Sequence, residues 1–82
     1  MTQETIAQIM QDIFRDIFDQ PSLVITRETS AKDIEDWDSL SHVNIVVAAE
    51  KAFKVTFALG ELKSLNNVGD MYDLIQKKLS HA

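Results

Sequence analysis

An acidic residue, a serine and a histidine fall within the five consecutive positions 38–42, and these are the residues whose types and spacing could do chemistry. Asp38 is a favourable N-cap residue, because its carboxylate can accept hydrogen bonds from backbone N–H groups one turn further along a helix. Ser39 would then be the first helical residue, with its hydroxyl at the positive end of the helix dipole. A phosphate esterified to this hydroxyl would be stabilised by the dipole and by the backbone N–H groups.

A serine hydrolase would need a base, a group that orients the base and an oxyanion hole around Ser39. His42 lies three residues later on the same face of the predicted helix, so the spacing allows a contact with Ser39. No Gly-x-Ser-x-Gly motif surrounds Ser39, however, and no third residue is evident. We therefore interpret His42 as an exposed helix residue and Ser39 as a substrate of another enzyme, so the chain itself is not expected to be an enzyme. The alternative is an unmodified helical interaction module in which Ser39 only follows the cap.

The helix that Ser39 opens is predicted to end near Phe53. The stretch contains no Gly or Pro, and its apolar residues recur at spacings of three and four. A first helix is predicted from about Thr5 to Phe18, with a regular apolar stripe along one side. Pro21 cannot continue that helix, which should therefore stop shortly before it.

Two further helical segments are predicted towards the C-terminus. A short helical turn follows Gly60 and directs Leu62 inward, and a last helix runs from Val68 to about Leu79 behind a cap at Asn66-Asn67. The predicted fold is an all-α four-helix bundle with three longer helices, one short helix and a long loop between the first two helices. A chain of 82 residues is expected to form one domain, over residues 1–82.

The long loop between Asp19 and Trp37 has no periodicity, and loops of this length in compact domains are often functional or held by their own side chains. We predict that four apolar residues pin this loop to the core: Leu23, Val24, Ile25 and Ile34. Trp37 directly precedes the cap, and we expect it to lie across the first turn of the helix as a hydrophobic staple.

The composition restricts the kinds of partner that the chain can bind, because the formal net charge is −5. Ahead of Ser39, the acidic residues Asp33, Glu35 and Asp36 form either a solvated loop or a patch that faces a partner. An acidic chain without clustered Lys and Arg is not expected to bind nucleic acid, but it suits partners with basic patches.

The chain has no cysteine, and no metal site is expected. No secretory signal or membrane-spanning segment is recognised, so we expect a cytoplasmic monomer that does not bind membranes.

The tripeptide Asp38-Ser39-Leu40 and the helix that follows it resemble the acyl carrier proteins. The matching residues on that helix are Val43, Ile45, Val46, Glu50 and Phe53. The resemblance extends over nearly the whole chain, and it implies that Ser39 carries 4′-phosphopantetheine from coenzyme A, whose thiol holds acyl intermediates as thioesters. The implied partners are a phosphopantetheinyl transferase and acyl-loading, condensing or acyl-transfer enzymes with basic docking patches. The implied setting is fatty-acid, polyketide or related lipid and secondary-metabolite biosynthesis, with a peptidyl or amino-acyl carrier as the alternative.

The resemblance also implies roles for other positions. Asp38 would help to present the site and a divalent cation to the transferase. The positions that would face partner enzymes are Leu40, Val43, Val47 and Glu50. Position 49 usually has a larger aliphatic residue where an acyl chain can enter the bundle. The candidates for an acyl pocket are Ala49, Phe57, Leu62 and Met71.

Four positions near this helix depart from the acidity that is usual in the family. They are Ser41, Asn44, Lys51 and Lys54. This departure favours a specialised discrete carrier over the housekeeping fatty-acid carrier. It also leads us to expect that the electrostatic attraction of a basic partner depends on the preceding acidic loop.

Overall fold

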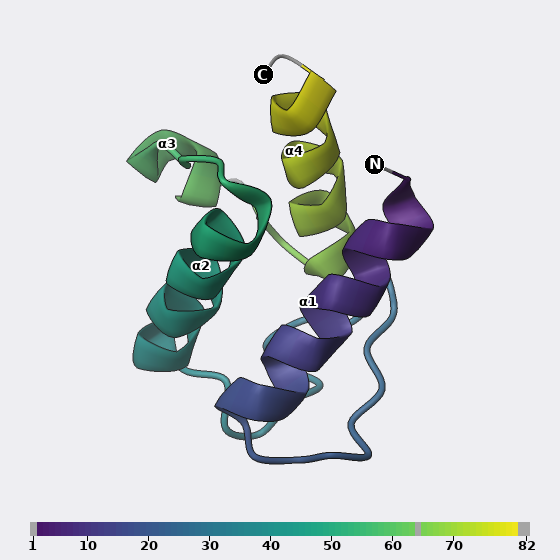
Figure 1. Cartoon of the computed structure of the whole chain (residues 1–82). Coiled ribbons are helices and arrows are strands. Elements are labelled where there is room, and N and C mark those ends of the chain that lie inside the picture. Colours follow the sequence, from purple (N-terminus) through teal and green to yellow (C-terminus); the bar gives the residue numbers. More distant parts are fainter. Residues whose placement is uncertain (1, 64, 81–82) are drawn as a thin grey trace.

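The computed structural model describes residues 2–63 and 65–80, and this part of the chain contains four helices and no strand (Figure 1). The helices are α1 (Gln3–Ile17), α2 (Ser39–Phe53), α3 (Leu59–Lys63) and α4 (Val68–Ser80). The predicted all-α fold with three longer helices and one short helix is confirmed. α1 begins two residues earlier than predicted, because Thr2 caps it by accepting the Thr5 N–H at 3.3 Å. Ser64 of the predicted short turn lies outside the described residues. No helix in the described ranges is both long and apolar enough to cross a bilayer.

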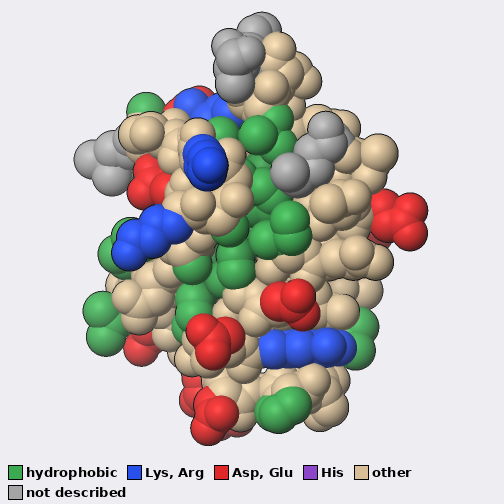
Figure 2. All heavy atoms as spheres, viewed as in Figure 1, with side chains coloured by type: hydrophobic (Ala, Val, Ile, Leu, Met, Phe, Trp, Pro, Cys, Tyr) green, Lys and Arg blue, Asp and Glu red, His purple; other side chains and the backbone are tan. Residues whose placement is uncertain are grey.

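The hydrophobic core is shared by the three longer helices, because α1 packs against both α2 and α4 (Figure 1). The fully buried residues of α1 recur every four positions, at Ile6, Met10 and Phe14. The other two helices contribute Ile45, Val46, Ala49, Phe53, Val68, Met71, Tyr72 and Ile75. Figure 2 shows hydrophobic side chains in the middle of one face, between α2 and α4. The amphipathic spacing of each helix therefore produces one continuous core.

The chain between α1 and α2 is held to the bundle at several points. Arg15 of α1 donates from Nε to the Leu23 carbonyl at 2.7 Å, and a glutamine side chain of α1 accepts the Ile25 N–H at 3.2 Å. Ile25 and Ile34 are buried, as predicted. Val24 is 67% exposed, so its predicted role as a pin is wrong. Consecutive side chains in a non-helical segment point in different directions, so three adjacent apolar residues cannot all reach the core.

The same loop is joined to the start of α4 by backbone hydrogen bonds. The Val68 N–H donates to the Thr29 carbonyl and the Gly69 N–H donates to the Arg27 carbonyl, both at 2.8 Å. A Cβ atom on Gly69 would lie only 2.9 Å from the Arg27 carbonyl oxygen, so this close approach requires glycine. The Arg27 guanidinium also forms an ion pair with Asp73 of α4 at 2.9 Å. The first N–H groups of a helix have no acceptor within the helix, and these contacts supply acceptors for two of them in α4. The contacts also fix the loop to α4.

The connection from α2 to α3 begins at Lys54, whose backbone is left-handed with φ 56° and ψ 47°. The Glu50 carboxylate accepts the Phe57 N–H at 2.9 Å, which holds the connection against α2. Glu61 of α3 forms an ion pair with Lys78 of α4 at 2.8 Å. The short helix is thereby attached to α4, and the connection that leads to it is attached to α2.

Candidate functional site

Asp38 organises the N-terminus of α2. Its carboxylate accepts the Ser41 N–H and its carbonyl accepts the His42 N–H, both at 2.9 Å. The hydrogen bond from the Ser41 N–H lowers the pKa of the Asp38 carboxyl below its usual value, because this bond stabilises the charged form. Asp38 is therefore the N-cap of α2, and Ser39 is the first helical residue.

Ser39 is exposed at the positive end of α2. The other three helices each have an acidic residue in the first turn, and these residues are Glu4, Glu61 and Asp70. α2, whose residues are all described, has no acidic residue in its first turn. An anion attached to Ser39 would therefore be stabilised by the helix dipole and would not be repelled by a carboxylate within the first turn of α2. The carboxylate next to it in the chain belongs to the cap residue, Asp38.

Trp37 and His42 pack against each other beside Ser39. The half-buried Trp37 ring makes an edge contact with Phe14 at 5.2 Å between ring centroids and lies 6.5 Å from Phe18. On its other side it stacks on His42, with centroids 6.1 Å apart and ring planes 20° apart. These two residues occupy the N′ and N4 positions of α2, so the staple predicted for Trp37 is present. His42 was predicted to be exposed, and this is wrong. The residue is half-buried, because the stack covers one face of its imidazole.

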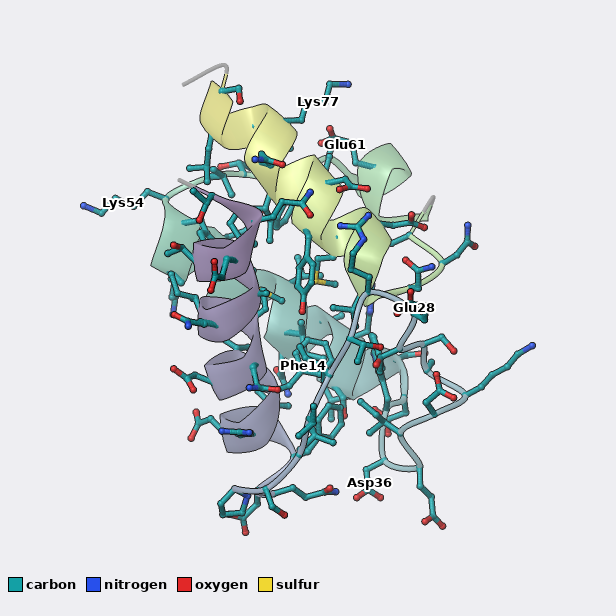
Figure 3. All side chains as sticks on the ribbon, turned by 90° about the vertical axis from the view of Figure 1, so that its right-hand side faces the viewer. Phe14, Glu28, Asp36, Lys54, Glu61 and Lys77 are labelled. Carbon is teal, nitrogen blue, oxygen red and sulfur yellow. The ribbon has the colours of Figure 1, made fainter. Side chains whose placement is uncertain are left out.

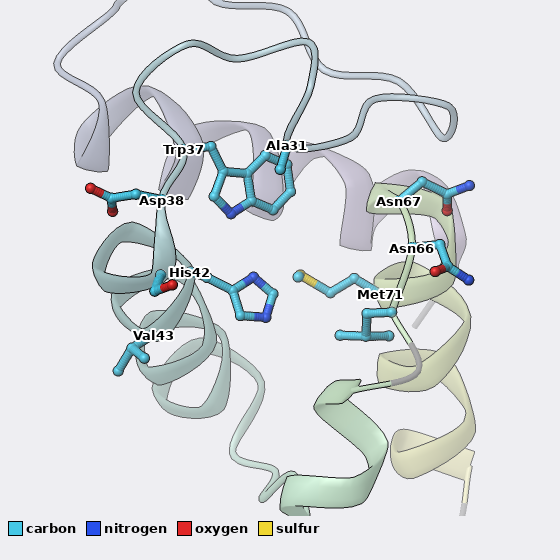
Figure 4. Close-up of a pocket in the computed structure, with 10 residues that line it drawn as sticks. Ala31, Trp37, Asp38, His42, Val43, Asn66, Asn67 and Met71 are labelled. Carbon is cyan, nitrogen blue, oxygen red and sulfur yellow. The ribbon is translucent and has the colours of Figure 1, made fainter.

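A cleft of about 530 Å³ opens beside Ser39 (Figure 4). Its walls come from the loop ahead of α2, the start of α2, and the segment that leads into α4. The lining residues are Ala31, Trp37, Asp38, Ser39, His42, Val43, Leu65, Asn66, Asn67 and Met71. Figure 4 shows the His42 ring and the Met71 thioether pointing into the space between α2 and α4. The cleft therefore offers both apolar and hydrogen-bonding groups next to the Ser39 hydroxyl.

The structure brings one of the four predicted acyl-pocket residues to this cleft, namely Met71. Ala49 and Phe57 are buried in the core, and Leu62 is half-buried against it. Whether any of the four contacts an acyl chain stays a prediction. The far wall of the cleft was not assigned to the site from sequence, because the packing of α4 against the loop creates it and no local pattern marks it. Its residues are Ala31, Leu65, Asn66 and Asn67.

Three of the predicted partner-facing residues form an exposed apolar stripe on α2. Leu40, Val43 and Val47 are 69%, 55% and 41% exposed, respectively. Glu50, the fourth, is half-buried and directs its carboxylate to the Phe57 N–H. A contact between these residues and a partner stays a prediction, but the three apolar side chains are accessible for one.

The acidic residues ahead of Ser39 are also accessible. Asp33, Glu35 and Asp36 are all exposed, and Asp33 additionally accepts the Ser30 N–H at 2.9 Å within a turn. Figure 3 shows the Asp36 carboxylate at the outer edge of the loop. The loop thus presents negative charge at the end of the molecule where α2 begins.

Comparison with known proteins gives the family. An acyl carrier protein from Acidothermus cellulolyticus is 37% identical over 75 residues, which are 92% of this chain and 89% of that protein. This chain belongs to the acyl carrier protein family. An acyl carrier protein from Thermobifida fusca is likewise 37% identical, over 76 residues that span 93% of this chain and 96% of that protein.

Further similarities agree with this membership. A meromycolate extension acyl carrier protein from Mycobacterium leprae is 36% identical over 77 residues, which are 94% of this chain and 67% of that protein. The solution NMR structure of a holo acyl carrier protein from Geobacter metallireducens is 55% identical with a TM-score of 0.85, over 92% of this chain and 86% of that one. No protein-family model matches the chain. This acyl carrier protein is a carrier in lipid biosynthesis, and it works with a covalently attached phosphopantetheine.

Proposed function

We propose that Ser39 is the residue to which phosphopantetheine is attached. The observation that carries this proposal is the position of Ser39 directly after the Asp38 cap, where a phosphodiester gains most from the helix dipole. Two further observations support it. The Ser39 side chain is exposed, and the cleft beside it gives the prosthetic group space to lie against the protein.

Attachment requires a phosphopantetheinyl transferase with coenzyme A as the donor. The Ser39 oxygen attacks the phosphorus that bears pantetheine, the pyrophosphate bond breaks, adenosine bisphosphate leaves, and the hydroxyl proton passes to a base. Within the described residues, no hydrogen bond joins Ser39 to His42, whose imidazole stacks on Trp37. We infer that the base comes from the transferase. The resemblance to the family implies that Asp38, the N-cap of α2, would help to present a divalent cation there.

The thiol of the prosthetic group then holds acyl intermediates as thioesters and passes them between acyl-loading, condensing or acyl-transfer enzymes. We assign these intermediates to fatty-acid, polyketide or related lipid biosynthesis. An amino-acyl or peptidyl cargo is the second candidate, and the cleft supports it with polar side chains that a purely aliphatic chain would not use. These are His42, Asn66 and Asn67.

The experiment is intact-mass analysis after incubation with coenzyme A and a broad-specificity phosphopantetheinyl transferase. The parent protein should gain one phosphopantetheine, and Ser39→Ala should gain none. Ser41→Ala is the matched control, because it removes the other hydroxyl in the same turn and should be modified like the parent. Modification that persists in Ser39→Ala, or that never appears in the parent, would refute the proposal.

A further inference from the structure

The exposed stripe of α2 continues beyond its apolar residues into two lysines. Successive members of the stripe, Leu40, Val43, Val47 and Lys51, are separated by three or four residues and so share one side of the helix. Lys54 follows directly after the end of α2 and is exposed as well. One side of α2 thus presents apolar groups near Ser39 and the charge of Lys51 at its far end, and Lys54 adds positive charge just beyond that end.

Neither lysine is neutralised by the rest of the protein. Glu50 is the one acidic residue in α2, and its carboxylate is directed to the Phe57 N–H. Lys51 and Lys54 form no ion pair with any residue in the described ranges. Their charges are therefore available to an external partner.

The position of Lys54 is informative because its backbone is left-handed. Glycine adopts that conformation with less strain than any residue with a Cβ atom, and it is the usual residue at a helix end of this kind. Positive charge at Lys51 and at Lys54 interacts favourably with the C-terminal end of the helix dipole, but at position 54 this gain is offset by the strain of the left-handed backbone. Figure 3 shows the Lys54 side chain extending away from the body of the protein.

The opposite end of the stripe is negative. Asp33, Glu35 and Asp36 lie in the loop ahead of Ser39, and Figure 3 shows Asp36 at the bottom of the molecule and Lys54 at its upper left. The side of the protein along α2 therefore has an apolar centre between two charged poles. The acidic pole is formed by Asp33, Glu35 and Asp36, and the basic pole by Lys51 and Lys54. A partner whose contact surface carried positive charge along its whole length would be attracted at one pole and repelled at the other.

We propose that this side docks on an enzyme surface with carboxylates opposite Lys51 and Lys54, an apolar centre, and cationic side chains opposite the acidic loop. The inference rests on the proposed function, since the enzyme must act on the group carried by Ser39. It differs from the expectation drawn from sequence, in which only a basic patch attracts the partner. An enzyme is favoured over an anionic membrane as the occupant, because the acidic pole and the net charge of −5 oppose such a membrane.

The test uses holo protein and the acyl-loading enzyme purified from the source organism by its ability to acylate this protein. Lys51→Glu and Lys54→Glu are each compared with Lys77→Glu, which makes the same charge change. Lys77 is a suitable control because it is exposed in the last turn of α4, as Lys51 is in the last turn of α2. Melting curves establish that every variant is folded.

At low salt, kcat/KM for acylation should fall about five- to tenfold in Lys51→Glu and Lys54→Glu, and it should change less than about twofold in Lys77→Glu. The differences should shrink at about 0.5 M NaCl, because salt screens the charges.

Equal values for the three variants at low salt, or faster acylation of Lys51→Glu, would overturn the inference. It would also be overturned if the parent sedimented with vesicles containing about one third phosphatidylserine and the Lys51→Glu change abolished this while acylation stayed unchanged. A failure of the proposed function would appear separately, as the absence of phosphopantetheine from the intact mass of every variant, and it would remove the basis of the inference.

Discussion

The close approach between Gly69 and the loop allows a quantitative prediction for Gly69→Ala. The new Cβ would lie 2.9 Å from the Arg27 carbonyl oxygen, 3.0 Å from its Cβ and 3.3 Å from its Cα. Ordinary van der Waals contacts begin at 3.4 Å, so the backbone of the loop would have to retreat by about 0.5 Å. The same carbonyl accepts the Gly69 N–H at 2.8 Å, and the retreat would stretch this bond to the limit of useful hydrogen-bond lengths.

The expected magnitude follows from three contributions. Overpacking against backbone atoms costs about 1–3 kcal/mol, and a weakened hydrogen bond costs about 0.5–1.5 kcal/mol. Alanine favours the helix by about 0.5–1 kcal/mol relative to glycine, which offsets part of this. Gly69→Ala should therefore lower the free energy of unfolding by about 1–3 kcal/mol, which corresponds to a melting temperature about 5–15 °C lower in a domain of this size.

Gly60→Ala is the matched control, because a Cβ on Gly60 would meet nothing within 4 Å. Gly60 lies in α3 and its φ is not positive, so alanine should raise stability by about 0.4–1 kcal/mol. Thermal and urea unfolding followed by circular dichroism would measure both variants. The reasoning would be refuted if Gly69→Ala melted at or above the temperature of the parent. That result would mean that the loop gives way freely and is not fixed to α4.

Two further predictions concern charge and backbone strain. The hydrogen bonds from Arg27 and Gln3 lower the pKa of Asp73, so their stabilisation is present above the usual pKa of about 4 and is lost as the pH falls through the lowered pKa. Asp73→Asn should reduce the melting temperature by about 2–5 °C at pH 7, where both side chains of the pair are about half exposed and screened, and by progressively less as the pH falls below about 4. Lys54→Gly should stabilise the protein by about 1 kcal/mol by relieving the left-handed backbone, whereas Lys54→Ala keeps that strain and should not. Equal stability of the glycine and alanine variants in denaturant titrations would contradict the strain argument.

The fold could be predicted from sequence because its helices carry strong local signals. The stripe on α1 and the cap at Asp38 place two of the long helices directly. The early start of α1 was missed, although Thr2 is a favourable cap residue, because the apolar periodicity is clear only further along. Val24 was wrongly placed inside, because an irregular segment has no period to show which of three adjacent apolar residues turns inward.

The site was only partly predictable, since it depends on contacts between distant segments. The Trp37–His42 stack could have been found in full from sequence, because the two residues occupy the N′ and N4 positions of a helix that was already predicted. The cleft has no such signal, since Asn66 and Asn67 reach it only after α4 packs against the loop. The pairing of Arg27 with Asp73 likewise joins residues 46 positions apart and leaves no trace in local periodicity.

The fixed loop ahead of α2 has a consequence for how cargo travels. Ser39 is held by a capped helix on one side and by Trp37, which is packed on Phe14, on the other. If the prosthetic group is attached to Ser39, as we propose, the point from which it swings is a rigid pivot and not a flexible tether. Once α2 is seated on an enzyme, the reach of the thiol is limited to the length of the arm itself. Delivery to a second active site beyond that radius requires the whole domain to dissociate and dock again.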